Sequence, residues 1–236
     1  ANAIGTALAS GISRAISSVA REPGLWEVDA NLRPEGKSGP LVRTLASHEA
    51  YYARWAESWE FQALLKARSI AGDAELGRRY EAAVAPLIWS SAGRDGFVES
   101  VQAMRRRVTE HIPAAEEQRQ IKLGRGGLSD AEWLVQLLQL QHAGKHPQLR
   151  TTSTLPALEA AAELGLLDGD DADLLGQAWR LASRIRSANV IWNGKASDLL
   201  PSSRRDLEAV ARWCGYEPGQ AAALGEDYLR GSRGAR

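Results

Sequence analysis

The sequence predicts a mainly α-helical protein with a short strand-bearing region near its start. Alanine, leucine and arginine dominate the 236 residues, whereas valine, isoleucine and phenylalanine are scarce, and this composition favours helices. Apolar residues recur at spacings of three and four along most of the chain, which is typical of amphipathic helices. Glycine and proline residues separate these periodic segments from one another.

The first expected elements are a helix over residues 2–20 and a strand over residues 25–31. Apolar residues line one face of the helix, and an Arg-Glu-Pro-Gly turn ends it. In the strand, polar and apolar residues alternate, which places Asp29 on a polar face. A loop rich in proline and glycine follows, and residues 41–42 are a candidate second strand.

The rest of the chain is expected to be helical. A long helix is predicted over residues 47–69, because Tyr52, Trp55 and Trp59 share one face at helical spacing. Further helices are predicted at residues 76–90, 95–110, 130–143, 155–164, 171–193, 203–214 and 219–230. Residues suited to ending and starting helices stand at Gly165, Gly194, Gly215, Ser153 and Ser203.

Composition and charge exclude several classes of protein. The 29 basic and 29 acidic side chains cancel, which argues against nucleic-acid binding through a broad basic face. No apolar run approaches the roughly 20 residues of a membrane span, and no signal peptide opens the chain. The single cysteine, Cys214, excludes a disulfide framework and fits a reducing compartment. We therefore expect a cytoplasmic protein with no nucleic-acid or membrane partner.

Asp29 and Arg33 form the first candidate site. Asp29 stands directly before a glycine-containing turn, where a carboxylate is well placed to hold a divalent metal ion at the edge of a cleft. The plainer interpretation is a solvated residue at a strand edge. Arg33 is suited either to a phosphate contact or to an ion pair with Glu35.

The glycine-rich segment from Lys122 to Glu132 is the second candidate. Its glycines and cations precede a helix N-terminus, where backbone N–H groups can cradle a phosphate. The alternative is structural, with Ser129 and Glu132 forming a capping box and Asp130 lying in the first turn of the helix. Local physics favours the structural interpretation.

The remaining motifs indicate structure rather than chemistry. The acidic residues between positions 168 and 173 lack the glycine and glutamate of a calcium loop, and the four histidines show no metal-ligand pairing. The eight tryptophans recur at helical spacing and are expected to lie mostly in the core. Cys214 is expected to serve packing.

Three sequence blocks occur in order along the first part of the chain. Residues 28–42 contain Val-Asp-Ala-Asn-Leu-Arg-Pro-Glu-Gly and then Gly-Pro-Leu-Val. Residues 59–73 contain Trp-Glu and Lys-Ala-Arg, closing with Gly-Asp, and residues 121–133 contain Ile-Lys-Leu-Gly-Arg-Gly-Gly-Leu-Ser-Asp. These blocks resemble the signatures of the glutamine synthetase adenylyltransferase/adenylyl-removing enzymes, in an actinobacterial-like wording, with Ala131 and Trp133 as departures.

The resemblance implies both a fold and an activity. It implies part of a polymerase-β-like nucleotidyltransferase domain of the α+β class over residues 1–78, followed by an all-helical bundle over residues 79–236. The implied reaction transfers AMP from ATP to a tyrosine of glutamine synthetase with Mg²⁺ as cofactor, which regulates nitrogen assimilation. A second copy of the catalytic domain in the same protein removes that AMP by phosphorolysis.

The resemblance also implies roles for single residues. Asp29 stands where the family has the third of its Mg²⁺-binding carboxylates. Arg33, Lys66 and Lys122 are the candidates for contact with the substrate or its phosphates. A Gly-Ser-Asp-x-Asp segment supplies the other carboxylates in the family, and nothing before Asp29 matches it. We therefore expect a fragment that begins partway through the catalytic domain.

The family has two homologous halves, and the sequence beyond residue 136 is more similar to the C-terminal, adenylylating half. Two alternatives keep part of this interpretation. In the first, the helical region is a non-catalytic module that docks glutamine synthetase or the PII signal protein. In the second, the chain is a relative of the PII uridylyltransferase, which shares the helical region. That enzyme continues into phosphohydrolase domains, whose His-Asp pairs are absent from this sequence.

We predict that the 236-residue chain does not catalyse adenylyl transfer by itself, because one carboxylate cannot hold two metal ions against water. The measurement is label transfer from ATP to glutamine synthetase in the presence of Mg²⁺, beside a longer chain that extends upstream. Equal rates for the two chains would place the catalytic carboxylates within these residues.

Overall fold

The computed structural model describes residues 2–17 and 28–235. The chain divides into two compact units, Ala1–Ser91 and Ala92–Arg236, which are described separately. The prediction of a mainly α-helical protein is confirmed, since β-pairing in the described residues is limited to one antiparallel bridge between Gln120 and Leu199. None of the helices in these ranges has the length and apolar character needed to cross a membrane.

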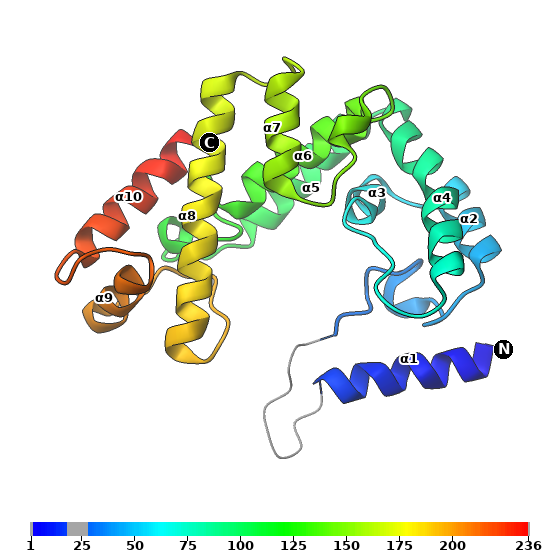
Figure 1. Ribbon diagram of the computed structural model, residues 1–236, viewed down its shortest axis with the longest axis horizontal. Helices are drawn as coiled ribbons and strands as arrows, with labels where there is room; N and C mark the ends of the chain where they lie inside the picture. Colours follow the sequence, from blue (N-terminus) through cyan, green and yellow to red (C-terminus); the bar gives the residue numbers. More distant parts are fainter. Residues whose placement is uncertain (1, 18–27, 236) are drawn as a thin grey trace. The chain divides into compact units, whose positions relative to one another are not determined.

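The first unit contains α1 to α4 (Figure 1). Helices α2 and α3 both pack against α4, and the loop before α2 contains a short 3₁₀ turn, Gly36–Ser38. The helix bounds are α1 Asn2–Ser17, α2 Leu45–Arg54, α3 Ser58–Leu64 and α4 Ala74–Ser90. The prediction for α1 is confirmed as far as residue 17, and residues 18–20 lie outside the described residues.

The two predicted strands of this unit are corrected where they can be compared. Residues 25–27 lie outside the described residues, and residues 28–31 are not a strand but lead into a turn. The Asp29 carboxylate accepts the N–H of Asn31 at 2.8 Å, a local bond that competes with strand pairing. Residues 41–42 form a bend. Alternation of polar and apolar residues was therefore not sufficient to form a strand, because a strand also needs a neighbouring strand to pair with.

The prediction of one long helix over residues 47–69 is wrong. Helix α2 ends at Arg54, with Trp55 as its C-cap, and a capping box between Glu57 and Glu60 starts α3. The carboxylate of Glu60 is buried, and it accepts the hydroxyl of Tyr51 at 2.9 Å. Because the helix breaks after Trp55, Trp59 belongs to α3 and not to the helix of Tyr52. Tyr52 is buried, whereas 72% of Trp55 is exposed.

Aromatic side chains form the core beside α4. Tyr52 packs against Phe61, and the His48 ring stacks on Tyr52 and meets Tyr80 edge-on. Burial, together with the positive charge of Arg43, lowers the pKa of His48, so the neutral imidazole is favoured in this cluster.

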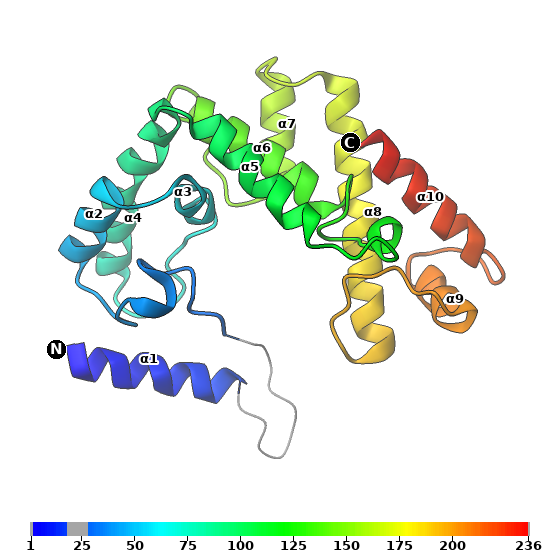
Figure 2. The same cartoon turned by 180° about the vertical axis from the view of Figure 1, so that it is seen from behind.

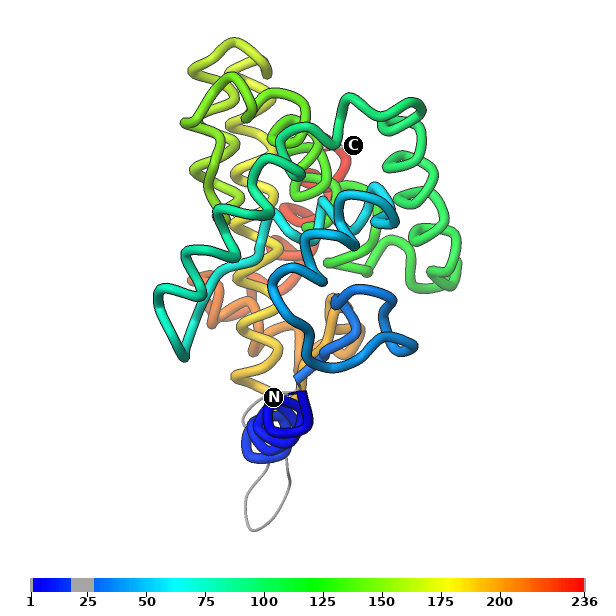
Figure 3. Tube along the Cα trace, turned by 90° about the vertical axis from the view of Figure 1, so that its right-hand side faces the viewer, coloured from blue at the N-terminus to red at the C-terminus, as the bar shows by residue number. Residues whose placement is uncertain are grey.

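The second unit contains α5 to α10, and the 25-residue α8 runs through it (Figures 1, 2 and 3). Helices α6 and α7 lie on one side of α8, and α9 and α10 lie on the other. The bounds are α5 Phe97–Glu110, α6 Leu128–His142, α7 Thr154–Glu163, α8 Gly169–Asn193, α9 Arg204–Trp213 and α10 Ala221–Gly234. The predicted helices from residue 76 onward are therefore confirmed, with ends shifted by a few residues.

Two apolar clusters hold the second unit together. Ile185, Val210 and Leu224 are fully buried where α8, α9 and α10 meet. Val135 and Ala157 belong to the other cluster, where α6 and α7 pack against α8. Each fully buried aliphatic side chain of this size stabilises the fold by about 1.5–3 kcal/mol relative to exposure.

Helix ends and the lone cysteine agree with the predictions at most positions. Gly194 ends α8 with a left-handed backbone, φ 65°, which a side chain would strain. Ser203 caps α9, whereas Ser153 stands at the start of α7 without a side-chain capping bond. Cys214 is buried, and burial raises the pKa of its thiol to about 11, so its role is packing.

The tryptophan prediction is confirmed only in part, because Trp59, Trp89, Trp133 and Trp179 are half-buried and Trp179 packs against both apolar clusters. No tryptophan in the described ranges is fully buried, and Trp26 lies outside them. Those with an exposed side chain are Trp55, Trp192 and Trp213. Helical spacing alone did not separate core positions from surface positions.

We predict that Ser203→Ala lowers the free energy of unfolding by about 1 kcal/mol, because the hydroxyl accepts the N–H of Asp206 at 3.0 Å. The matched control is Ser202→Ala, whose serine is exposed and stands outside the cap. Urea unfolding of the two variants measures the difference. Equal midpoints would show that the cap does not stabilise α9.

Candidate functional site

Arg33 fastens the loop that carries Asp29. Its guanidinium donates through Nη1 to the carbonyl oxygen of Ala30 at 2.6 Å, and through Nε and Nη2 to that of Gly39 at 3.2 and 3.0 Å. These bonds tie the backbone beside Asp29 to the far end of the loop. The structure thus gives Arg33 a positioning role, while its predicted phosphate contact stays a prediction.

The order of proline and glycine in this loop has a steric cause. A Cβ atom on Gly39 would lie 2.2 Å from the carbonyl oxygen of Pro34, whose own side chain is fully buried. Glu35 adopts a left-handed backbone with φ 62°, which is uncommon for a residue other than glycine. Its carboxylate pairs with Arg43 and not, as one alternative had it, with Arg33.

Arg43 is a residue that sequence reasoning missed. Besides Glu35, it donates to Ser47 at 3.2 Å, and its guanidinium carbon lies 5.9 Å from the centre of the Tyr51 ring. It therefore joins the loop to the first turns of α2. Arg43 directly follows the first sequence block, and only the structure shows its partners.

The described residues do not make up a magnesium site by themselves. Asp29 is exposed, and one of its oxygens accepts the N–H of Asn31. Within residues 2–17 and 28–235, no three His, Cys, Asp or Glu side chains converge as ligands for a metal ion. The residues present therefore do not fit Mg²⁺ as a complete set, and Asp29 stays a prediction as one ligand of a larger site.

The two predicted lysines are exposed and belong to different units. Lys66 follows α3 in the first unit, where its N–H donates to the carbonyl oxygen of Ala63 at 3.1 Å. Lys122 lies in the glycine-rich loop of the second unit. Their contacts with substrate or phosphate stay predictions.

The backbone of the glycine-rich loop is already engaged within the second unit. It pairs with the segment after α8, where the N–H of Ile121 donates to the carbonyl oxygen of Asp198 at 2.7 Å. N–H groups that donate within the protein belong to Lys122, Leu123, Gly126, Gly127, Leu128 and Ser129. A phosphate cradle needs free N–H groups that converge on one point. This loop therefore favours the structural interpretation.

Asp130, and not Ser129, fastens the loop. Its carboxylate accepts the N–H of Gly126 at 2.5 Å and pairs with Arg105 at 2.7 Å. Arg105 also donates to Thr109 and to the carbonyl oxygen of Leu123. The Arg105 side chain is 13% exposed, so the ion pair with Asp130 is partly shielded from water. Sequence reasoning did not identify this pair.

The predicted capping box of Ser129 and Glu132 is wrong. Helix α6 begins two residues earlier than expected, with Gly127 at the N-cap position, so Ser129 lies inside the first turn. The Ser129 side chain is buried, and the backbone N–H of Ser129 donates to the carbonyl oxygen of Lys122. The sequence pattern was misleading because the tight turn at Gly126 shifts the start of the helix.

Gly126 explains why the loop is rich in glycine. Its φ of 71° is left-handed, and a Cβ atom there would lie 1.7 Å from the carbonyl oxygen of Ser232 in α10. The hydroxyl of Tyr228, also in α10, donates to the backbone carbonyl oxygen of Gln120 at 3.1 Å. The loop is therefore packed directly against the last helix.

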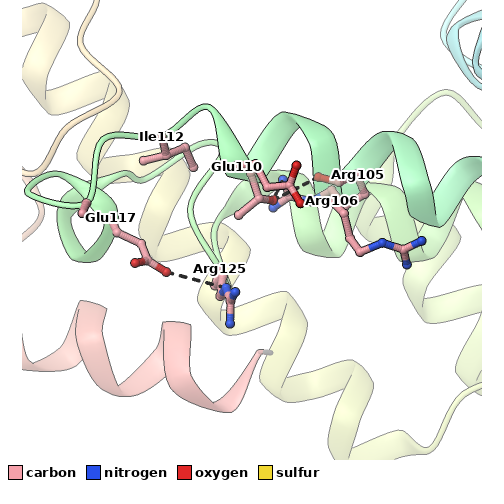
Figure 4. A pocket seen from close by; sticks show the side chains of 8 residues that line it. Arg105, Arg106, Glu110, Ile112, Glu117 and Arg125 are labelled. Atoms are coloured by element: carbon pink, nitrogen blue, oxygen red, sulfur yellow. Dashed lines mark hydrogen bonds and ion pairs between the residues drawn. The ribbon is translucent and has the colours of Figure 1, made fainter.

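A cavity of about 420 Å³ opens beside this loop (Figure 4). Figure 4 shows Glu117 and Arg125 pointing toward one another, and their charged atoms lie 3.6 Å apart. The guanidinium of Arg105 is engaged by Asp130. Of the three arginines that line the cavity, Arg105 and Arg125 pair with carboxylates, and only the exposed Arg106 forms no ion pair among the described residues. One such cation gives no independent sign of a phosphate site.

We predict that Asp130→Ala lowers the free energy of unfolding by about 3 kcal/mol, because it leaves the largely buried Arg105 without a partner. The control is Asp173→Asn, an exposed acidic residue on α8, which should change stability by less than about 0.5 kcal/mol. Equilibrium unfolding followed by circular dichroism measures both. A stable Asp130→Ala variant that no longer binds ATP would instead favour a phosphate site.

Two family models match the chain. The model described as glutamate-ammonia ligase adenylyltransferase matches residues 1–83, and the model described as PII-uridylyltransferase (GlnD) matches residues 102–233. The second match covers the helical unit, in agreement with the expectation that this region is shared by the two enzymes.

Curated relatives match nearly the whole chain. Three are bifunctional glutamine synthetase adenylyltransferase/adenylyl-removing enzymes. That of Streptomyces avermitilis is 48% identical over 98% of this chain and 23% of its own length. The enzyme of Leifsonia xyli is 48% identical over 94% of this chain and 22% of its own length. The enzyme of Mycobacterium marinum is 47% identical over 98% of this chain and 23% of its own length. This chain therefore spans less than a quarter of their length, and it belongs to the family of bifunctional glutamine synthetase adenylyltransferase/adenylyl-removing enzymes.

Proposed function

We propose that this chain is part of an enzyme that transfers AMP from ATP to a tyrosine of glutamine synthetase and so regulates nitrogen assimilation. The observation that carries the proposal is the identity of 44–50% to relatives with this name over most of the chain. We further propose that the enzyme acts in the cytoplasm, uses Mg²⁺ and reverses its modification by phosphorolysis in a second catalytic domain.

The half of the enzyme to which the chain belongs is part of the proposal. We assign it to the C-terminal, adenylylating half, on the basis of Trp133 and of the residues over 151–155 and 193–201. The proposed division into the end of a nucleotidyltransferase domain, residues 1–78, and a helical domain, residues 79–236, belongs to the same assignment.

In the reaction, the tyrosine oxygen attacks the α-phosphorus of ATP, and pyrophosphate leaves. Catalysis of such a step depends mainly on positioning and on neutralising charge. Asp29 is the residue of this chain that we assign to the reacting centre, together with acidic residues from elsewhere in the protein. The Arg33 bonds to Ala30 and Gly39 support this role, because they restrict the backbone next to Asp29.

A second candidate function is a docking module. The helical unit matches the family model of a PII-uridylyltransferase, an enzyme named for a different protein substrate. A region shared by enzymes with different substrates is suited to a common task, such as binding the PII signal protein. In this interpretation the chain would bind PII or glutamine synthetase, and catalysis would belong to other parts of the protein.

We predict that Asp29→Asn in the full-length enzyme reduces adenylyl transfer on the order of a thousandfold, because removal of one metal-binding carboxylate forfeits several kcal/mol of transition-state stabilisation. The amide keeps the acceptor for the Asn31 N–H, so the fold should be unchanged. The measurement is the initial rate of labelled AMP incorporation into glutamine synthetase.

The control is Glu49→Gln, which removes an exposed carboxylate of α2 in the same unit. It should leave the rate unchanged. Near-wild-type activity of Asp29→Asn would remove Asp29 from the reacting centre. Loss of PII or glutamine synthetase binding in a variant of the helical unit, with Asp29→Asn fully active, would favour the docking module.

A further inference from the structure

Arg43 links the loop that carries Asp29 to the helix that follows this loop. Its guanidinium pairs with the carboxylate of Glu35, in the middle of the loop, and donates to the hydroxyl of Ser47 in the first turn of α2 at 3.2 Å. The same group lies over the ring of Tyr51, one turn further along the helix. The Arg43 side chain is 12% exposed, so these contacts are largely shielded from water.

The bonds of Arg33 do not make this link. Arg33 donates to the carbonyl oxygens of Ala30 and Gly39, which both belong to the loop, so it closes the loop without fastening it to a helix. Glu35 lies between these two ends and has a left-handed backbone with φ 62°. This conformation is unfavourable for a residue with a side chain unless its surroundings hold it there. The ion pair with Arg43 provides such a hold.

The contacts of Arg43 serve the position of the loop more than the stability of the fold. Its Nε is buried and forms no hydrogen bond among the described residues, and a buried donor without an acceptor lowers stability. The Glu35 carboxylate is 52% exposed, so water screens the ion pair from one side. The pair does specify where the loop sits against α2, because a guanidinium presents its donors in a fixed planar geometry.

We propose that Arg43 is a positioning residue for adenylyl transfer, which sets the place of Asp29 by fixing Glu35 against α2. The inference rests on the proposed function, in which Asp29 belongs to the reacting centre. The Asp29 carboxylate is itself bound to the N–H of Asn31 in the same loop, so a shift of the loop would move this carboxylate. A displacement of about 1 Å from the productive geometry can cost on the order of a hundredfold in rate.

The first measurement is amide hydrogen exchange in the full-length enzyme, followed by mass spectrometry. The variants are Arg43→Ala and Glu35→Ala, and the second tests the same pair from a half-exposed side chain if the first fails to fold. We expect amides within residues 30–39 to exchange about tenfold faster or more in both variants, while those of α4 stay protected. The control is Arg54→Ala, an exposed arginine in the last turn of α2, which should leave exchange unchanged.

The second measurement is the rate of AMP transfer by the same variants, with and without Asp29→Asn. We expect Arg43→Ala to lower kcat about tenfold or more while the KM for glutamine synthetase stays unchanged, and Arg54→Ala to leave both constants unchanged. In the Asp29→Asn background, Arg43→Ala should lower kcat no further, because a positioning residue acts through the group that it positions. A merely structural role would lower kcat by the same factor in both backgrounds.

The outcomes separate this inference from the proposed function. Unchanged exchange over residues 30–39, or an equal loss of kcat in both backgrounds, would overturn the positioning role and leave the proposed function intact. A fully active Asp29→Asn variant would overturn the positioning role together with the place of Asp29 in the reacting centre. A wild-type enzyme that transfers no AMP would overturn the proposed function, and hydrogen exchange would still decide whether Arg43 holds the loop.

Discussion

The contact between Arg105 and Asp130 is the interaction on which the second unit depends most. One carboxylate binds the guanidinium of α5 and the N–H of Gly126, and so it fixes the turn where α6 begins. That turn approaches α10 so closely that glycine is required. The same region also pairs with the segment after α8, through the antiparallel bridge between Gln120 and Leu199. A single partly buried ion pair thus joins α5 to the start of α6, next to the turn that packs against α10.

The first unit uses the same device. Arg33 holds the carbonyl oxygens of Ala30 and Gly39, and Arg43 holds Glu35 and α2. In both units an arginine closes a glycine-containing loop through its several fixed donors, which a lysine could not reproduce. Two of the three sequence blocks that resemble the family, those at residues 28–42 and 121–133, are therefore, in large part, blocks that shape loops. Their glycines and arginines are explained by sterics and hydrogen bonds before any catalytic role is considered.

Much of the helical structure could be predicted from sequence, because apolar period and punctuation agree from residue 76 onward. The failures have physical causes. The alternation before Asn31 indicated a strand, but Asp29 forms a local turn bond. The aromatic spacing of 47–69 indicated one helix, but the buried Glu60 starts a second. The expected cap at Ser129 was wrong because the turn at Gly126 moves the start of the helix. The pair of Arg105 with Asp130 was not predicted because the two residues are 25 positions apart in the sequence.

The central claim is that the glycine-rich loop is a structural element held by Arg105 and Asp130. A double-mutant cycle with Arg105→Ala, Asp130→Ala and the double variant tests it most directly, with the free energy of unfolding as the readout. The account predicts a coupling energy of about 2 kcal/mol, because each single variant leaves a charge without its partner. Additive effects, with a coupling energy within about 0.5 kcal/mol of zero, would contradict it.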